Sequence, residues 1–181
     1  MKYVRASLIA LTVALAASSA HAADALDPAR VRFGVNFGIG SGIGFAADAS
    51  LNNLAQIAPG VNLGARISVG YVPSVFSVAA APVATFAFQN GGLWVGPSIA
   101  LAIADGTNIG FGLTTGVEYN VNQQIMLFGG LYLGVVPNVA GIVTAGVDID
   151  ITSNFSGFFE ARTNFGTGTS FGLGAGVAYR F

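Results

Sequence analysis

The fold is decided by the stretch FGLGAGVAYRF, residues Phe171–Phe181. Every second position from Phe171 carries an apolar side chain, whereas the positions between them carry glycine, alanine or arginine. This period of two is the pattern of a β-strand with one apolar face and one small or polar face. The alternation continues to an aromatic residue, Phe181, so the apolar face covers the whole segment. Such a face must lie against something other than water.

The same alternation recurs along the chain. Eight further segments show it, namely 31–48, 61–71, 76–88, 93–103, 109–119, 125–135, 143–151 and 159–165. Short stretches rich in Gly, Asn, Asp, Pro and Ser separate them, as at 89–92 and 152–154, and such stretches favour turns. Short turns join strands that are neighbours in sequence, so we expect an antiparallel meander.

The composition indicates where this sheet lies. The chain is 53% hydrophobic and only 8% charged, and a water-facing surface normally carries many more charges. A soluble β-sandwich, the rival fold, therefore does not fit. Strands of about 9–11 residues cross a bilayer when tilted, and apolar rows facing lipid around a small or polar lumen fit a closed barrel. We predict an all-β fold, a closed antiparallel up-and-down transmembrane β-barrel with short loops.

The number of strands follows from parity. Counting 31–48 as one strand gives nine, whereas single-chain bacterial barrels use an even number. A hairpin turn at Gly40-Ser41-Gly42 divides the segment. A three-residue loop there would pair position 39 with position 43 and keep Ile43 on the lipid side. We therefore predict ten strands. Eight strands is the alternative, in which two weaker segments merge or form loop.

One stretch breaks the alternation. Residues 50–59 space Leu51, Leu54 and Ile57 like one face of a helix. We expect a short helix or a linker there.

Two prolines are also irregular, because proline has no N–H to donate to a strand ladder and a closed barrel has no edge. If Phe88 pairs with Leu93, Pro82 and Pro97 fall in one patch of one hairpin. A β-bulge is expected in that patch.

The first residues have the pattern of an export signal. Lys2 and Arg5 precede an apolar run, and Ala20-His21-Ala22 is an A-x-A cleavage pattern. We predict a cleaved signal peptide at 1–22 and a barrel domain at 23–181. The only histidine, His21, belongs to the predicted signal peptide, and the chain has no cysteine. These are common catalytic and metal-ligating residues, so we expect no enzyme activity, no cofactor and no metal site.

Charged residues gather on the face opposite the apolar rows. They are Arg32, Asp48, Arg66, Glu118, Asp148, Asp150, Glu160, Arg162 and Arg180. Unpaired buried charge is costly, so we expect these residues to neutralise one another as a lumen charge network. Asp148, Asp150 and Glu160 could alternatively bind a cation or form an acid–base pair. The same parity places Trp94 inside.

The C-terminal residues also carry a resemblance. Gly172–Phe181 and Gly116–Asn120 resemble segments of the small bacterial outer-membrane β-barrel superfamily, the opacity-protein and OmpA/OmpX-like group. The ending Tyr179-Arg180-Phe181 is similar to the signal strand that such barrels present to their assembly machinery. The resemblance implies an outer-membrane location, an assembly signal at Tyr179 and Phe181, and outer-membrane lipid and the assembly machinery as partners.

The function expected from these features is a structural or envelope-integrity role for a barrel with a narrow, glycine-lined, salt-bridged lumen. The alternative is a small passive, porin-like channel for ions or small solutes. The small lumen residues fit both, because they allow a narrow barrel to close and can also leave a water path. No basic patch for nucleic acid is present. The sequence leaves the oligomeric state open.

Overall fold

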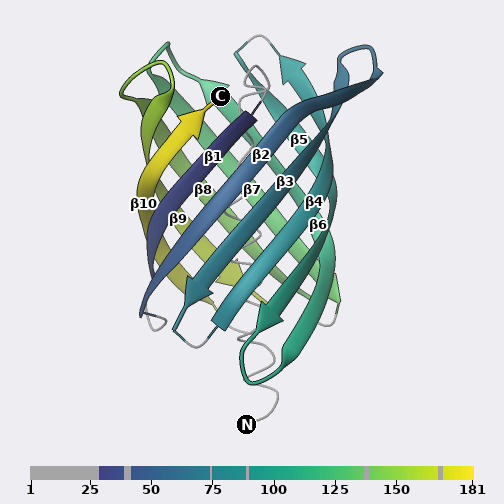
Figure 1. Cartoon of the computed structure of the whole chain (residues 1–181), viewed down its shortest axis with the longest axis vertical. Helices are drawn as coiled ribbons and strands as arrows, with labels where there is room; N and C mark the ends of the chain where they lie inside the picture. The colour runs from purple at the N-terminus through teal and green to yellow at the C-terminus, as the bar shows by residue number, and fades with distance from the viewer. Residues whose placement is uncertain (1–28, 39–41, 74, 89, 137–138, 167–168) are drawn as a thin grey trace.

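The computed structural model describes residues 29–38, 42–73, 75–88, 90–136, 139–166 and 169–181. Within these ranges the chain forms ten strands, each antiparallel to its sequence neighbours (Figure 1). They are β1 Ala29–Gly38, β2 Gly42–Ala58, β3 Val61–Val72, β4 Val75–Phe88, β5 Gly91–Ile103, β6 Thr107–Asn120, β7 Ile125–Val136, β8 Ala140–Asp150, β9 Phe155–Phe165 and β10 Ser170–Arg180. Pairing of β1 with β10 closes the sheet. The predicted closed ten-stranded barrel is confirmed, and the predicted signal peptide lies outside the described residues.

The first hairpin accounts for the tenth strand. Gly38 pairs with Gly42 and Phe37 pairs with Ile43, so the connection is 39–41, one position earlier than predicted. It still has three residues, and Ile43 therefore keeps its predicted outward direction and is 56% exposed. Gly42 has φ 78°, a conformation that glycine adopts without the steric cost of a side chain.

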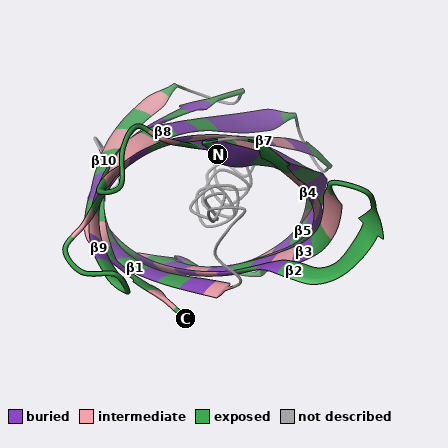
Figure 2. Ribbon diagram, turned by 90° about the horizontal axis from the view of Figure 1, so that it is seen from above, coloured by how far each residue is buried: buried purple, intermediate pink, exposed green. Residues whose placement is uncertain are grey.

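Apolar side chains cover the outside of the barrel. Along β1, Val31, Phe33, Val35 and Phe37 are exposed, while Arg30 and Arg32, at alternate positions, are buried. Figure 2 shows buried and exposed stretches alternating around the oval ring of strands. An apolar exterior around a polar interior is the arrangement of a membrane barrel and the reverse of a soluble sandwich.

In the described ranges no helix is long and apolar enough to cross a bilayer.

The segment 50–59 is not the predicted helix or linker. It continues β2 as far as Ala58, with register shifts against β3 after Leu51 and after Gln56. The resulting β2–β3 hairpin projects outward from the ring of strands, at the right of Figure 2. Helical spacing of three apolar residues did not decide the structure, because pairing with β3 satisfies the backbone of this segment. Gly60, with φ 74°, makes the turn.

The prediction for the two prolines is right in position and wrong in geometry. Phe88 pairs with Gly91 instead of Leu93. The pairs Ala80↔Ile99 and Ala84↔Val95 follow one register across the prolines, so Pro82 and Pro97 lie opposite each other without a bulge. Both prolines are exposed on the outer face. The β4–β5 ladder is interrupted at this point because neither residue has an N–H.

Candidate functional site in the barrel lumen

The predicted lumen residues do point inward. Arg32, Asp48, Arg66, Glu118, Asp148, Glu160 and Arg162 are buried, and Asp150 and Arg180 are partly exposed at one end. Sequence reasoning missed one member, Arg30, which is 2% exposed. Its parity matches that of Arg32, so extending the β1 alternation by one step would have found it. With Arg30 the network holds five arginines and five carboxylates.

An ion-pair bridge crosses the lumen. Nη2 of Arg32 on β1 donates to Oδ2 of Asp148 on β8 at 2.5 Å, and Arg30 contacts the same carboxylate. Nη1 of Arg30 lies 3.7 Å from Oε1 of Glu118 on β6. In the strand order β6 is diametrically opposite β1. The side chains of this bridge, Arg30, Arg32, Glu118 and Asp148, therefore span the inside of the barrel.

The other carboxylates have separate partners. Glu160 pairs with Arg162 on the same strand, and Oδ2 of Asp150 accepts a hydrogen bond of 2.8 Å from Nη1 of Arg180. Asp148, Asp150 and Glu160 thus belong to three different ion pairs. No group of three or more His, Cys, Asp or Glu residues suited to a metal ion occurs in the part of the chain that the structure describes. The alternative of a joint cation site is not favoured by this geometry.

Three inward aromatic rings lie over glycines of the next strand. Trp94 pairs with Gly116, Phe128 with Gly146, and Phe158 with Gly176. A Cβ atom added at Gly116 would lie 2.7 Å from the Trp94 ring, and one at Gly176 would lie 2.7 Å from the Phe158 ring. At Gly146 it would overlap the Phe128 ring. Glycine is needed at these positions because each ring occupies the space of the missing side chain.

Arginines stack on these rings. The guanidinium carbon of Arg66 lies 4.4 Å from the Trp94 ring centroid, and that of Arg32 lies 4.6 Å from Phe128 and 5.1 Å from Phe158. Cation–π contacts of this kind are worth more when the cation is withdrawn from water. The inward direction predicted for Trp94 is confirmed. Phe128 and Phe158 were missed, although an aromatic residue and a glycine in register on adjacent strands would have indicated them.

Asn52, which lies at the first register shift of β2 against β3, adds a polar contact beside the Arg66–Trp94 stack. Nη2 of Arg66 donates to Oδ1 of Asn52 at 3.1 Å, and Oγ1 of Thr85 donates to the backbone oxygen of Asn52 at 3.2 Å. Asn52 is buried. The segment that was expected to be a helix therefore supplies a side chain to the lumen.

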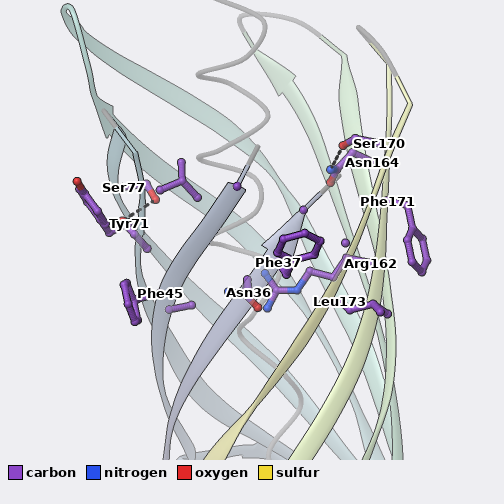
Figure 3. Close-up of a pocket in the computed structure, with 16 residues that line it drawn as sticks. Asn36, Phe37, Phe45, Tyr71, Ser77, Arg162, Asn164, Ser170, Phe171 and Leu173 are labelled. Atoms are coloured by element: carbon purple, nitrogen blue, oxygen red, sulfur yellow. Dashed lines mark hydrogen bonds between the residues drawn. The ribbon is translucent and has the colours of Figure 1, made fainter. Parts of the chain in front are cut away.

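The two ends of the lumen differ. At the terminal end, where β1 begins and β10 ends, a mouth of about 470 Å³ is lined mainly by amide side chains and the Asp150–Arg180 pair. Its amide residues are Asn90, Asn120, Asn122, Gln123 and Gln124. At the opposite end, β4, β5, β7 and β8 contribute an apolar cluster around Tyr132 and Ile142. Beside that cluster lies a cavity of about 50 Å³, lined by residues of β9, β10, β1, β2, β3 and β4 (Figure 3).

The predicted assembly-signal residues lie at the terminal end. Tyr179 is exposed on the outer face, and its ring stands edge-on to that of Phe181 with 4.9 Å between centroids. The backbone N–H of Phe181 donates to the oxygen of Ala29 at 3.1 Å, so the last residue continues the β1–β10 seam. Both rings are on the surface, where another molecule can reach them.

Comparisons with known proteins bear on the fold. No protein-family model matches the chain, and no curated protein matches it. Among solved structures, the KdgM porin in complex with disordered oligogalacturonate has 12% identity and a TM-score of 0.55 over 84% of this chain and 98% of the other. A structure of the KdgM porin has 13% identity and a TM-score of 0.50, over 84% and 99%. Outer membrane phospholipase A from Escherichia coli has 11% identity and a TM-score of 0.47, over 84% and 92%.

At these identities the likeness concerns the fold alone. Together with the apolar exterior, it shows a small β-barrel of the outer-membrane type. The predicted tie to the opacity-protein and OmpA/OmpX-like group is not confirmed, because the likeness to the KdgM porin structures supports an outer-membrane barrel and does not specify that group.

Proposed function

We propose that this protein is a structural barrel of the bacterial outer membrane whose lumen is closed by its own side chains. The bridge from Arg30 and Arg32 to Glu118 and Asp148 carries this proposal, because it joins opposite walls. Charged groups taken out of water are held strongly only when they are paired. The balanced network thus favours one closed arrangement over a freely moving set of charges.

The proposal includes no catalytic step. Asp148, Asp150 and Glu160, the carboxylates considered for acid–base work, are paired with arginines, and a general acid or base needs access to a substrate. The surrounding partner is outer-membrane lipid, which the exposed apolar rows contact. The exposed rings of Tyr179 and Phe181 are proposed as the contact with the assembly machinery, in line with their resemblance to a signal strand. We further propose that residues 1–22 are removed on export.

Reconstitution of the folded protein into a planar lipid bilayer tests the closed lumen. We expect no discrete current steps in 1 M KCl, a salt concentration at which small ions are abundant on both sides. Boiled and unboiled samples on a gel confirm folding, because a folded barrel resists detergent and migrates differently. Regular current steps from folded protein would overturn the proposal.

A passive channel is the second candidate, and the amide-lined mouth favours it. A mouth of about 470 Å³ gives water access to the terminal end of the lumen, and a ten-stranded wall encloses more space than the eight strands that side chains just fill. Such a channel would take small neutral solutes or ions of either sign, because the lumen charges balance. The oligogalacturonate of the KdgM complex is an acidic sugar, and a balanced lumen offers it no excess of positive charge.

A further inference from the structure

The small cavity at the opposite end of the barrel has features of a binding site. Figure 3 shows Arg162 extending toward Asn36, with Asn164 and Ser170 on one side and Ser77 on the other. The aromatic side chains of the same region, among them Phe45 and Phe171, point to the outer face. Most of the surface that lines the cavity is apolar, and the polar side chains that reach it are those of Asn36, Ser77, Arg162, Asn164 and Ser170.

Glycine creates the space. Gly38, Gly42, Gly70 and Gly172 line the cavity from four strands, so that part of the wall projects no side chains into it. The volume is about 50 Å³. One water needs about 10–15 Å³ by this kind of measure, so the cavity holds a group of about three or four heavy atoms.

Asn164 supplies an acceptor that points to a ligand. Its side chain is 3% exposed, and its Nδ2 donates to Oγ of Ser170 at 2.6 Å, which fixes the amide. Its Oδ1 has no hydrogen-bond partner among the described residues. Leaving a buried acceptor unsatisfied costs about 1–3 kcal/mol, so this oxygen favours any occupant that brings a donor.

The charges around the cavity select the kind of donor. Arg162 is paired with Glu160, so the site as a whole is neutral. An ammonium ion would meet the guanidinium of Arg162, and a carboxylate has no hydrogen to give Oδ1 of Asn164. A hydroxyl group donates and accepts at once, and it can also accept from Arg162 or from the amide of Asn36.

From these observations we propose that the cavity is a binding site for the end of a neutral polyol or sugar, with two adjacent hydroxyl groups inserted beside Asn164 and Arg162. One hydroxyl donates to Oδ1 of Asn164, and the other accepts from the guanidinium. The site lies at the end of the barrel opposite the terminal mouth, and binding there can be measured whether or not the lumen conducts.

Saturation-transfer NMR tests this site on the folded protein in lipid nanodiscs, without sugar-based detergent. Glycerol is the probe, and acetate and methylammonium are the charged comparators. We expect transfer to glycerol and only background transfer to the charged probes. Asn164→Leu keeps the size and removes the acceptor, and it should weaken glycerol binding about tenfold, the effect of one lost hydrogen bond to a buried group.

Thr163→Val is the matched control, because Thr163 is the next residue on β9 and is exposed on the outer face. It should bind glycerol like the unmodified protein. Gel mobility before and after boiling confirms that each variant is folded. Ser170→Ala, which releases the amide of Asn164, is the milder variant and should weaken binding severalfold if Asn164→Leu does not fold. Glycerol binding by folded Asn164→Leu, or by Ser170→Ala in its place, that equals binding by the unmodified protein would overturn the proposal, as would stronger acetate than glycerol transfer or no transfer to glycerol.

Discussion

At the scale of single residues, glycine in this barrel marks the place of an aromatic ring. Gly116 on β6 faces inward beneath Trp94, whereas Gly129 on β7, which pairs with Val117, faces outward, where an added Cβ would meet only ordinary van der Waals contacts. A Cβ at Gly116 would lie 2.6 Å from the oxygen of Gly129 and 2.7 Å from the indole, while the nearest atom to a Cβ at Gly129 is 3.8 Å away. A methyl group added at Gly116 therefore forces a shift, whereas one added at Gly129 fits without a shift.

Gly116→Ala should therefore destabilise the barrel, and Gly129→Ala should not. The added methyl group at position 116 forces the indole or the backbone to shift, and overpacking costs about 1–3 kcal/mol. Urea unfolding in lipid vesicles measures the difference. Equal free energies of unfolding for the two variants would show that the ring does not depend on the glycine.

The ion pairs give a second contrast between buried and partly exposed sites. Asp148→Asn leaves the buried Arg30 and Arg32 without their shared carboxylate, and removing one partner of a buried pair costs about 3–5 kcal/mol. Asp150→Asn removes a pair that water reaches at the terminal end, and exposed pairs contribute about 0–1 kcal/mol. The same vesicle unfolding assay compares the two. A smaller loss for Asp148→Asn than for Asp150→Asn would contradict the central place of the bridge.

Parity alone predicted which charged residues enter the lumen, since side-chain direction repeats every two residues in a strand. It could not predict that Arg32 pairs with Asp148, because contacts across the lumen depend on how the closed sheet curves. Register on neighbouring strands places Asp48 of β2 beside Arg32, yet the guanidinium pairs with Asp148 on β8, which is three strands from β1 on the other side. The alternation along a strand determines which way each side chain points, and the closure of the barrel determines which side chains meet across the lumen.

At the scale of elements, β2 shows how pairing overrides local spacing. Leu51, Leu54 and Ile57 have helical spacing, but β3 offers a partner as far as Val61. The two register shifts bend the ribbon, as bulges do.

The prolines of β4 and β5 gave the reverse error, in which a local rule predicted a bulge and the ladder tolerated two prolines facing each other. In both cases, hydrogen bonding between two whole strands decided the structure, and a rule applied to a few neighbouring residues gave the wrong geometry.

The β2–β3 hairpin also marks where the membrane-facing wall ends. Ile67 lies midway along β3 on the outer face, and Ile57 lies next to the last residue of β2, in the hairpin that projects from the ring of strands. Lysine at the bilayer midplane costs about 2–4 kcal/mol in such barrels and about 0–1 kcal/mol near the interface. Ile67→Lys should thus strongly reduce the free energy of unfolding in vesicles, and Ile57→Lys should have little effect. Equal losses would place the hairpin within the hydrocarbon.

At the scale of the whole molecule, the number of strands and the outward direction of the apolar rows were predictable from alternation and composition. What fills the lumen was not. Small residues opposite the apolar rows suggested either a narrow closed barrel or a water path, and the sequence could not show that rings lie over the glycines. The lumen depends on side chains from strands far apart in sequence, such as β1, β6 and β8.

The four charged side chains of the bridge can be tested together. Replacing Arg30, Arg32, Glu118 and Asp148 together with alanine removes two positive and two negative charges, so no buried charge is left without its partner in the bridge. Removing both partners of a buried pair is far less costly than removing one, and we expect the variant to fold. If the bridge closes the lumen, the variant should show discrete current steps in a planar bilayer where the unmodified protein shows none.

The double variant Asp150→Ala, Arg180→Ala is the control, because it removes a pair at the terminal mouth and leaves the bridge intact. It should remain silent. A folded quadruple variant without current would mean that the rings and the apolar cluster around Tyr132 are sufficient to block the lumen. Identical current steps in the quadruple variant and the unmodified protein would show that the path for ions bypasses the bridge, and the passive channel would then be the better account.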